Sequence, residues 1–241
     1  MSSTFNEFQQ PVGLALPDWQ GARFPTAQQI TGRYCKLERI NVERHAKTLY
    51  DAYCDTPDSR DWTYLATGPF TTFDSFLSYL TKIAAQTDPM HFAVIDLASM
   101  QAVGTLALMR IDASNGVIEV GWVTYSSRMK RSRVSTEVMS LLLDYVFEGL
   151  GYRRVEWKCD ALNAPSRAAA TRFGFTFEGI FRQAVVVHQR NRDTAWYSII
   201  DSEYPALREA FTLWLDEGNF DSKGQQIKRL ATLINNESTT A

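Results

Sequence analysis

The sequence has few of the residues that metal sites and disulfide frameworks require. Its 241 residues include three histidines and three cysteines. The cysteines, Cys35, Cys54 and Cys159, are widely separated and odd in number, which fits neither a zinc site nor a disulfide framework. We therefore expect no bound metal, and we expect a reducing, cytoplasmic location.

Long apolar runs and a large excess of one charge are also absent. The most apolar stretch, residues 91–109, is interrupted by Asp96, Ser99 and Gln101 and is too polar to cross a bilayer. The first ten residues lack the basic and apolar regions of a secretion signal. The net charge is −2, which gives no indication of nucleic-acid binding. We expect neither a membrane nor a nucleic acid as partner.

Several common catalytic motifs are missing. The chain has no Walker phosphate loop, no G-x-S-x-G and no H-E-x-x-H sequence. Gly149-Leu150-Gly151 is expected at the end of a helix, so it cannot cradle a dinucleotide at a helix start. These absences argue against P-loop nucleotide hydrolysis, dinucleotide-dependent redox chemistry, serine hydrolysis and zinc proteolysis.

Core-forming residues, in contrast, are plentiful. Hydrophobic residues make up 45% of the chain, with fourteen Phe, ten Tyr and six Trp. Alternating patterns predict strands and helical spacing predicts helices, in the order β-α-α-β-β-β-α-β-α-β-β followed by a closing helix. The expected strands cover 33–39, 91–97, 102–111, 117–124, 154–159, 175–187 and 194–200. The expected helices cover 44–54, 72–85, 133–150, 163–173 and 204–215.

This order predicts an α/β (α+β) fold in which one domain has a mixed, mostly antiparallel central sheet flanked by helices. Asn115-Gly116 is expected to form a hairpin turn with both residues at positive φ. Residues 1–30 are interpreted as an extended lead-in and residues 31–201 as the domain. Residues 202–241 are expected to form a closing helix and a polar tail that frays after about residue 226.

One loop carries a concentration of positive charge before a predicted helix. Residues 126–136, SSRMKRSRVST, contain Arg128, Lys130, Arg131 and Arg133. A helix start presents free backbone N–H groups and the positive end of the helix dipole, which together favour an anion such as a pyrophosphate. A solvated basic loop is the alternative. The loop by itself leaves both interpretations open.

Short motifs surround this loop in a specific order: IEVGW at 118–122, RRVEWKCD at 153–160, LNAPSR at 162–167 and FGFTFEGIFR at 173–182. This order resembles the GNAT superfamily of N-acetyltransferases, in its ribosomal-protein-acetyltransferase-like branch. The resemblance extends over roughly residues 31–214. Segments 62–65, 68–70 and 191–197 resemble an uncharacterised fungal and bacterial subgroup.

The resemblance implies that the chain binds acetyl-CoA and transfers the acetyl group, by direct attack, to a primary amine of a small molecule or of a peptide or protein N-terminus. The residues that it implies in cofactor binding are Trp122, Val123, Thr124, Arg128, Arg131, Ser132, Arg133, Val134, Ser135, Thr136, Asn163 and Ser166. The family's loop normally reads Q/R-x-x-G-x-G/A. Here Arg131 and Arg133 occupy the two small-residue positions.

Glu119 is the candidate general base. An aliphatic amine has a pKa of about 10.4, so a carboxylate must take its proton before it can attack. Glu119 precedes the basic loop on a strand, and its neighbours Ile118 and Val120 should face the opposite side. A structural ion pair is the alternative role. His188 is a second candidate base, although a lone strand histidine is more often structural.

Ser166 is the second candidate catalytic residue, because the resemblance implies that its side chain hydrogen-bonds the departing thiolate sulfur. The resemblance implies that Asn163, one helical turn earlier, holds the pantetheine. The same residues are a normal helix start, and both roles can coexist. Glu137 is expected to stabilise the start of its own helix, and Cys159 is expected to be a buried, inert thiol.

The acceptor pocket is assigned to four aromatic residues, Trp62, Tyr64, Phe70 and Trp122. Their alternative role is in the hydrophobic core. A second functional hypothesis is a catalytically degenerate member of the fold that binds CoA or another ligand as a sensor. A homodimer is left open.

Overall fold

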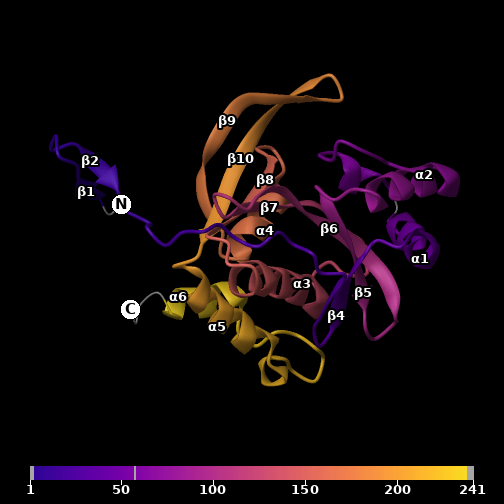
Figure 1. The fold of residues 1–241 in the computed structure, drawn as a ribbon. Helices are drawn as coiled ribbons and strands as arrows, with labels where there is room; N and C mark the ends of the chain where they lie inside the picture. Colours follow the sequence, from indigo (N-terminus) through magenta and orange to yellow (C-terminus); the bar gives the residue numbers. More distant parts are fainter. Residues whose placement is uncertain (1–2, 57, 238–241) are drawn as a thin grey trace.

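The computed structural model describes residues 3–56 and 58–237, and it is built on one mixed sheet. Eight strands lie in the order β3-β4-β5-β6-β7-β8-β10-β9 (Figure 1). Every neighbouring pair is antiparallel except β7 with β8. The strands are β3 (Gln29–Thr31), β4 (Cys35–Arg39), β5 (Met90–Asp96), β6 (Gln101–Asp112), β7 (Val117–Tyr125), β8 (Arg154–Asp160), β9 (Thr176–Val187) and β10 (Arg190–Ile200).

Helices cover both faces of this sheet. α1 (Val42–Cys54) and α2 (Phe73–Ala84) pack on one face, against Ala93, Ile95 and Ala102. The larger core lies on the other face, with side chains such as Val94 and Leu106. The helices there are α3 (Arg133–Asp144), α4 (Ala164–Arg172), α5 (Tyr204–Leu215) and α6 (Leu230–Glu237). Because successive strand residues point to opposite faces, one strand supplies both cores.

Four helices begin at a side chain that accepts a backbone N–H from the first turn. The pairs are Asn41 with Arg44 in α1, Thr72 with Ser75 in α2, Ser132 with Ser135 in α3, and Asn163 with Ser166 in α4. Such caps satisfy N–H groups that have no partner within the helix. The helix start predicted at Asn163 is therefore confirmed.

The predicted fold class and the order of elements from β4 to α5 are confirmed. Three shorter elements are also present: η1 (Arg60–Trp62), η2 (Tyr145–Gly149) and η3 (Glu217–Asn219). η2 is a π-helical turn, so the α-helix predicted over 133–150 ends at Asp144. Gly151 then closes the segment at φ +78°, with its N–H bonded to the Phe147 carbonyl.

The predicted turn at Asn115-Gly116 is wrong in detail. Only Gly116 has a positive φ. The Asp112 carboxylate accepts hydrogen bonds from the Asn115 backbone N–H, the Asn115 side chain and the Ser114 hydroxyl. These bonds organise the turn without a left-handed asparagine.

Both ends of the chain contain elements that were not expected. A hairpin of β1 (Ser3–Phe5) and β2 (Pro11–Gly13) projects away from the domain (Figure 1). The fraying predicted after residue 226 is wrong for 230–237, because Leu230 and Leu233 of α6 are buried in the larger core. Among the described residues, no helix is long and apolar enough to cross a membrane.

Candidate active site

The sheet opens between β7 and β8. These strands pair at Val117–Arg154, Ile118–Val155 and Glu119–Glu156, and no further pairing between them occurs in the part of the chain that the structure describes. β7 nevertheless continues to Tyr125 along β6, and β8 continues to Asp160 along β10. Two strand edges with free backbone groups therefore face each other beyond Glu119. Such edges can hydrogen-bond an extended ligand.

A backbone irregularity lies at the same opening. Trp122 has φ +50°, and the pairing of β6 with β7 shifts register between Thr105 and Ala107. A bulky residue in the left-handed region costs about 1–3 kcal/mol and is typically kept at functional positions. The predicted pantetheine contacts Trp122, Val123 and Thr124 form this irregular part of β7.

The loop after β7 leads directly to the N-terminus of α3. Met129 is fully buried and anchors this loop beside Gly104, where any Cβ would lie 2.5 Å from the Met129 sulfur. Ser126 is buried as well, and its hydroxyl donates to the Val103 carbonyl. The loop is therefore held against β6, with the first turn of α3 following it.

Three of the four basic residues in this loop have partners within the protein. Arg128 pairs with Asp55, Lys130 pairs with Asp61, and the Arg133 guanidinium lies 3.8 Å from the centre of the Phe220 ring. These contacts leave Arg131, which is exposed and has no hydrogen bond or ion pair among the described residues. Arg131 also has φ +59°. The left-handed backbone usual for glycine is thus kept by an arginine.

The hydroxyl groups at the start of α3 are used inside the protein. Ser132 caps the helix and donates to the Met129 carbonyl at 2.6 Å, and Ser135 donates to the Ser132 carbonyl at 2.7 Å. Thr136 accepts a hydrogen bond from Arg172 at 2.8 Å. Val134 packs its side chain into the core. An anion at this helix start would therefore meet backbone N–H groups.

Glu137 does not stabilise the start of its own helix, contrary to expectation. Its carboxylate accepts three backbone N–H groups at 2.7 Å each, from Arg33, Tyr34 and Cys35. This buried carboxylate fixes the turn that leads into β4. The position of Glu137 in α3 does not reveal this role, because the turn at residues 33–35 is distant in sequence.

Glu119 is buried on the face of β7 that is turned toward α1 and α2. Its neighbours Ile118 and Val120 belong to the larger core on the opposite face, as predicted. Glu119 Oε2 lies 3.1 Å from Arg110 Nε and 3.1 Å from Lys158 Nζ, without a well-aligned hydrogen bond from either. Burial raises the pKa of Glu119 above its usual value, and the two cations oppose this effect. The ion-pair role is therefore present and leaves the proposed base role untouched.

These contacts belong to a ladder of alternating charge on one face of the sheet. Lys158 Nζ also lies 2.6 Å from Glu156, which in turn contacts Arg154 at 2.9 Å. From the outer strand β9 to β6, the ladder consists of Glu178, Arg154, Glu156, Lys158, Glu119 and Arg110. The sequence alternation 154, 156, 158 indicated a shared face, but the partners on β7 and β9 were missed.

Ser166 lies on the opposite face of β8. Its hydroxyl oxygen accepts the Trp157 indole N–H at 3.0 Å, and its backbone N–H is capped by Asn163 at 3.1 Å. This bond leaves the Ser166 hydroxyl proton to donate elsewhere, and the neighbouring Cys159 sulfur is one acceptor. Beside it, burial raises the pKa of the Cys159 thiol, while the Ser166 hydroxyl acts in the opposite direction. Cys159 is thus a buried thiol, as predicted.

The structure separates the four predicted pocket aromatics. Trp62 and Phe70 pack edge to face at 5.3 Å, and they also contact Tyr53 of α1 and Phe76 of α2, respectively. Trp122 lies apart, 6.2 Å from the His91 ring. Tyr64 is half-buried in the loop after η1. Two of the four are therefore largely core residues.

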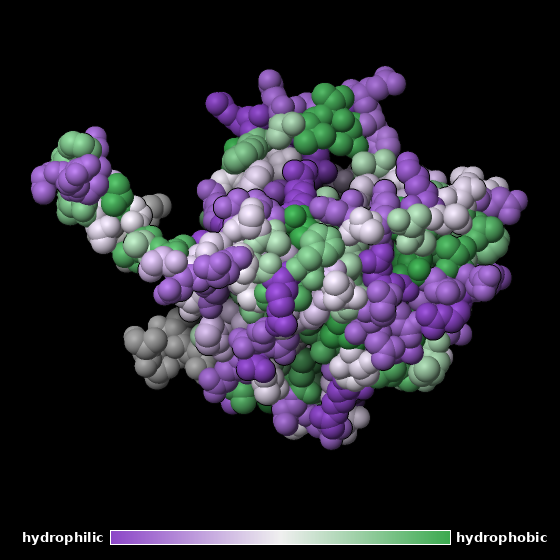
Figure 2. Space-filling model, in the orientation of Figure 1, coloured by the Kyte–Doolittle hydropathy of each residue, from purple (hydrophilic) through white to green (hydrophobic). Residues whose placement is uncertain are grey.

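The β9–β10 hairpin arches from the sheet toward the α1–α2 loop. At its tip, His188 Nε2 lies 3.1 Å from the Leu65 carbonyl oxygen. Hydrophobic residues gather on this projecting hairpin (Figure 2), and those that are exposed are Phe177, Ile180, Phe181, Val185 and Val186. The structure places the alternative base His188 at this tip. Sequence reasoning missed the arch, because the two segments are 123 residues apart.

Polar atoms without partners lie on the same side as the ladder. Thr194 Oγ1 and Trp196 Nε1 are buried and have no hydrogen-bond partner among the described residues, whereas Glu119 Oε2 has its two ion-pair contacts. Buried polar atoms are almost always paired, by protein, water or ligand. These atoms can therefore form hydrogen bonds with a polar ligand.

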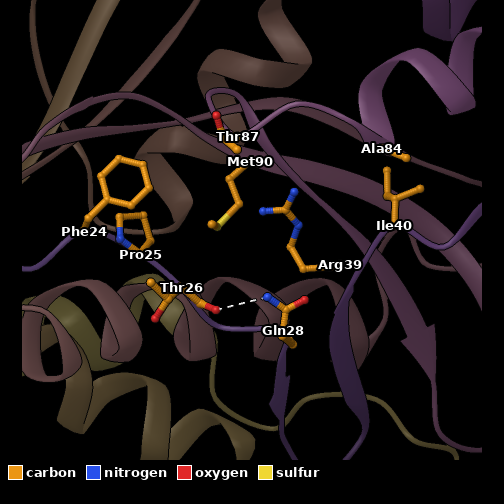
Figure 3. A pocket seen from close by; sticks show the side chains of 9 residues that line it. All are labelled: Phe24, Pro25, Thr26, Gln28, Arg39, Ile40, Ala84, Thr87 and Met90. Carbon is orange, nitrogen blue, oxygen red and sulfur yellow. Dashed lines mark hydrogen bonds between the residues drawn. The ribbon is translucent and has the colours of Figure 1, made fainter.

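A cavity of about 450 Å³ lies elsewhere, between the lead-in and the Arg39 end of β4 (Figure 3). The residues that line it are Phe24, Pro25, Thr26, Gln28, Arg39, Ile40, Ala84, Thr87 and Met90. None of them is a predicted site residue. No group of three or more metal-ligating side chains is found within the described residues. We therefore place the candidate site at the β7–β8 opening.

Comparison with known proteins identifies the family and the fold. The model of the acetyltransferase (GNAT) domain matches residues 36–176. The crystal structure of a GCN5-related N-acetyltransferase from Brucella melitensis is 46% identical, with a TM-score of 0.90 over 91% of this chain and 100% of that chain. An uncharacterised N-acetyltransferase, p20, from Bacillus licheniformis is 24% identical over 69% of this chain and 96% of its own length. The ribosomal-protein-serine acetyltransferase of Escherichia coli is 30% identical over 43% of this chain and 58% of its own length.

Proposed function

The chain belongs to the GNAT acetyltransferase family, and from this premise we propose that acetyl-CoA enters the β7–β8 opening and gives its acetyl group to an amine deprotonated by Glu119. Acetyl-CoA is the acyl donor of this family. The assignment of individual residues and of the acceptor is our proposal. The observation that carries it is the separation of two parallel strands directly beyond Glu119.

The donor is proposed to lie along the free edge of β7. The pyrophosphate would meet the backbone N–H groups at the start of α3, between Ser132 and Thr136, with Arg131 as the nearby cation that is not otherwise engaged. The pantetheine would run beside Trp122, Val123 and Thr124 as a strand does. Asn163 lies at the start of α4, on the β8 side of the opening.

The chemistry is a direct acyl transfer. Glu119 takes one proton from the acceptor ammonium, and the resulting amine forms a C–N bond to the thioester carbonyl carbon. The C–S bond then breaks, and the remaining extra proton on the attacking nitrogen passes to the departing sulfur, so that a neutral amide and the CoA thiol are formed. A raised pKa suits Glu119 for this step, because a base with a pKa nearer to the operating pH accepts a proton more readily.

Ser166 is proposed to donate a hydrogen bond from its hydroxyl to the departing sulfur. Glu119 and the Trp157–Ser166 pair lie on opposite faces of the sheet. The thioester, positioned between the strands, would have the amine on one side and the leaving-group donor on the other. This arrangement follows from the alternation of side chains along β7 and β8.

The acceptor is proposed to approach from the side of the charge ladder, under the β9–β10 hairpin. The unpaired Trp196 Nε1 and Thr194 Oγ1 lie there and can bind polar atoms of a small amine or of a peptide or protein N-terminus. We retain the cytoplasm as the proposed location, with neither nucleic acid nor membrane as a proposed partner. A homodimer remains a proposal for direct measurement.

The test is release of free CoA from acetyl-CoA in the presence of a broad amine panel. We expect turnover by the wild-type protein and a large loss in a Glu119→Gln variant that still binds acetyl-CoA. Thermal denaturation with acetyl-CoA measures binding separately, because a ligand of the folded state raises stability. Tight binding without turnover on any amine would contradict the proposal and support the sensor hypothesis, for which the strained Arg131 in the loop is the motivating observation.

A further inference from the structure

Lys158 is a buried lysine that the chemistry above does not use. Its side chain is 7% exposed, and its ammonium lies 2.6 Å from Glu156 and 3.1 Å from Glu119. The Trp196 ring covers it at 3.8 Å, and Phe181 of the hairpin stacks on Trp196 at 4.3 Å. A buried lysine is costly unless its charge is fully compensated. Two carboxylates and an aromatic face provide that compensation here.

The charged groups that face Glu119 come from two strands. β8 contributes Lys158 and Glu156, and β6 contributes Arg110. Arg110 and Lys158 stand at the same 3.1 Å from Oε2, but the Arg110 side chain is 63% exposed. Water and salt weaken an exposed charge far more than a buried one. Lys158 is therefore the dominant cation for Glu119.

We propose that Lys158 is a positioning residue, whose ammonium keeps the Glu119 carboxylate ionised and directed toward the β7–β8 opening while the Trp196 ring fixes that ammonium. The proposal rests on the assignment of Glu119 as the base. Burial alone would favour the protonated carboxyl, which cannot accept a proton from an amine. The Lys158 charge thus opposes the effect of burial, which favours the protonated form of Glu119.

The decisive variant is Lys158→Met, which keeps an unbranched side chain and removes the charge. Glu119 would retain Arg110 and Glu156 would retain Arg154, so neither carboxylate loses its last cation. We expect the acid limb of the pH profile of kcat/KM to move to higher pH by about one to two units, since an adjacent opposite charge typically changes a carboxyl pKa by this amount. On that limb, the rate at a fixed pH should fall about 10- to 100-fold.

Three further variants provide the controls. Lys158→Arg should keep the limb close to its wild-type position. Arg110→Gln should move it in the same direction but by less. Trp196→Leu keeps the Lys158 charge and removes the aromatic ring that covers it, and this variant should also move the limb by less. Trp196→Leu keeps the proposal testable if Lys158→Met does not fold. Acetyl-CoA binding should be unchanged in all of them.

A uniform loss of activity in Lys158→Met at every pH, with the limb unmoved, would overturn the proposal and leave Lys158 a structural residue. An unmoved limb in both Trp196→Leu and Arg110→Gln would count against it in the same way. Glu119→Gln separates the two levels of inference. If that variant is fully active, the base assignment fails; if it is inactive while Lys158→Met keeps the wild-type limb, only the role of Lys158 fails.

Discussion

The two faces of β7 and β8 differ sharply although the same strands form both. On the side of α3, Ile118, Val120 and Val155 are buried among hydrophobic side chains. On the side of α1 and α2, Glu119, Glu156 and Lys158 are buried as ions. A buried ion pair contributes little net stability compared with hydrophobic packing of the same volume. The difference indicates that the hydrophobic face contributes most of the stability, and it agrees with our proposal that the ionic face holds the base.

The strongest test of this comparison is Glu119→Gln. If the ionic face serves the chemistry, this variant should lose about 100- to 10,000-fold in kcat/KM, the range usual for a general base. Its melting temperature should change little. The matched control is Glu156→Gln, one strand away in the ladder. Equal activity of Glu119→Gln and wild-type protein would refute the assignment.

The neighbouring substitution Ile118→Ala addresses the other face. Ile118 is fully buried, so truncation should lower the free energy of unfolding by about 2–5 kcal/mol. Turnover per folded molecule should stay within a few-fold of wild type. Denaturant unfolding and steady-state kinetics on one preparation measure both. A large loss of turnover in stably folded Ile118→Ala would contradict the assignment of a purely structural role to Ile118.

Ser166→Ala tests the donor on the hydrophobic side of β8. Loss of one hydrogen bond to the leaving sulfur should lower kcat about tenfold, with the KM for acetyl-CoA nearly unchanged. Ser75→Ala is the control, because Ser75 also lies three residues after the N-cap of its helix, in the first turn of α2. A thioester with a more acidic thiol should reduce the defect. If both substitutions have the same effect on kcat, Ser166 is only a helix-start residue.

Arg131→Gly asks whether the strained loop residue binds the donor. Glycine should stabilise the protein by about 1 kcal/mol, because a left-handed backbone costs an arginine that much. If the side chain contacts the pyrophosphate, the same variant should bind acetyl-CoA more weakly, with a shallower dependence on salt. Unchanged binding together with higher stability would show that only the backbone serves the site.

The smallest expected effect is on stability as a function of pH. Since the pKa of Glu119 is raised in the folded protein, ionising this group costs the folded state more than the unfolded state. Wild-type protein should therefore lose stability relative to Glu119→Gln as pH rises above about 4.5, until the folded pKa is passed. Parallel urea titrations between pH 4 and 8 measure the difference. A constant difference would mean that the pKa of Glu119 is not raised.

The part of the site proposed to bind acetyl-CoA was predictable, because its residues follow one another in the chain. The motifs from Glu119 to Ser166 lie within one strand-helix-strand-helix unit, and the family membership and fold that they predicted are confirmed. The part proposed to bind the acceptor is formed by segments that are distant in the sequence. Neither the contact of His188 with Leu65 nor the stacking of Trp196 on Lys158 has a local pattern, because pairing partners across a sheet are set by the whole fold.

Short elements and long-range contacts explain the other differences between the predicted and the observed structure. β1 and β2 have three residues each, too few for an alternating pattern. α6 has only eight residues, and Leu230 and Leu233 are its buried contacts. Glu137 was assigned from its own helix, whereas the three N–H groups that it accepts come from a turn about a hundred residues earlier. The roles of the site residues remain predictions.

The short seam between β7 and β8 also has a mechanical consequence. Within the described residues, three backbone pairs join the strands from β3 to β7 to β8, β10 and β9, so the sheet divides into two parts beyond Glu119. A donor lying in the opening would take the place of a strand between these two parts. Backbone amides on the facing edges, at residues 122–125 and 157–160, should then exchange hydrogen more slowly with acetyl-CoA than without it.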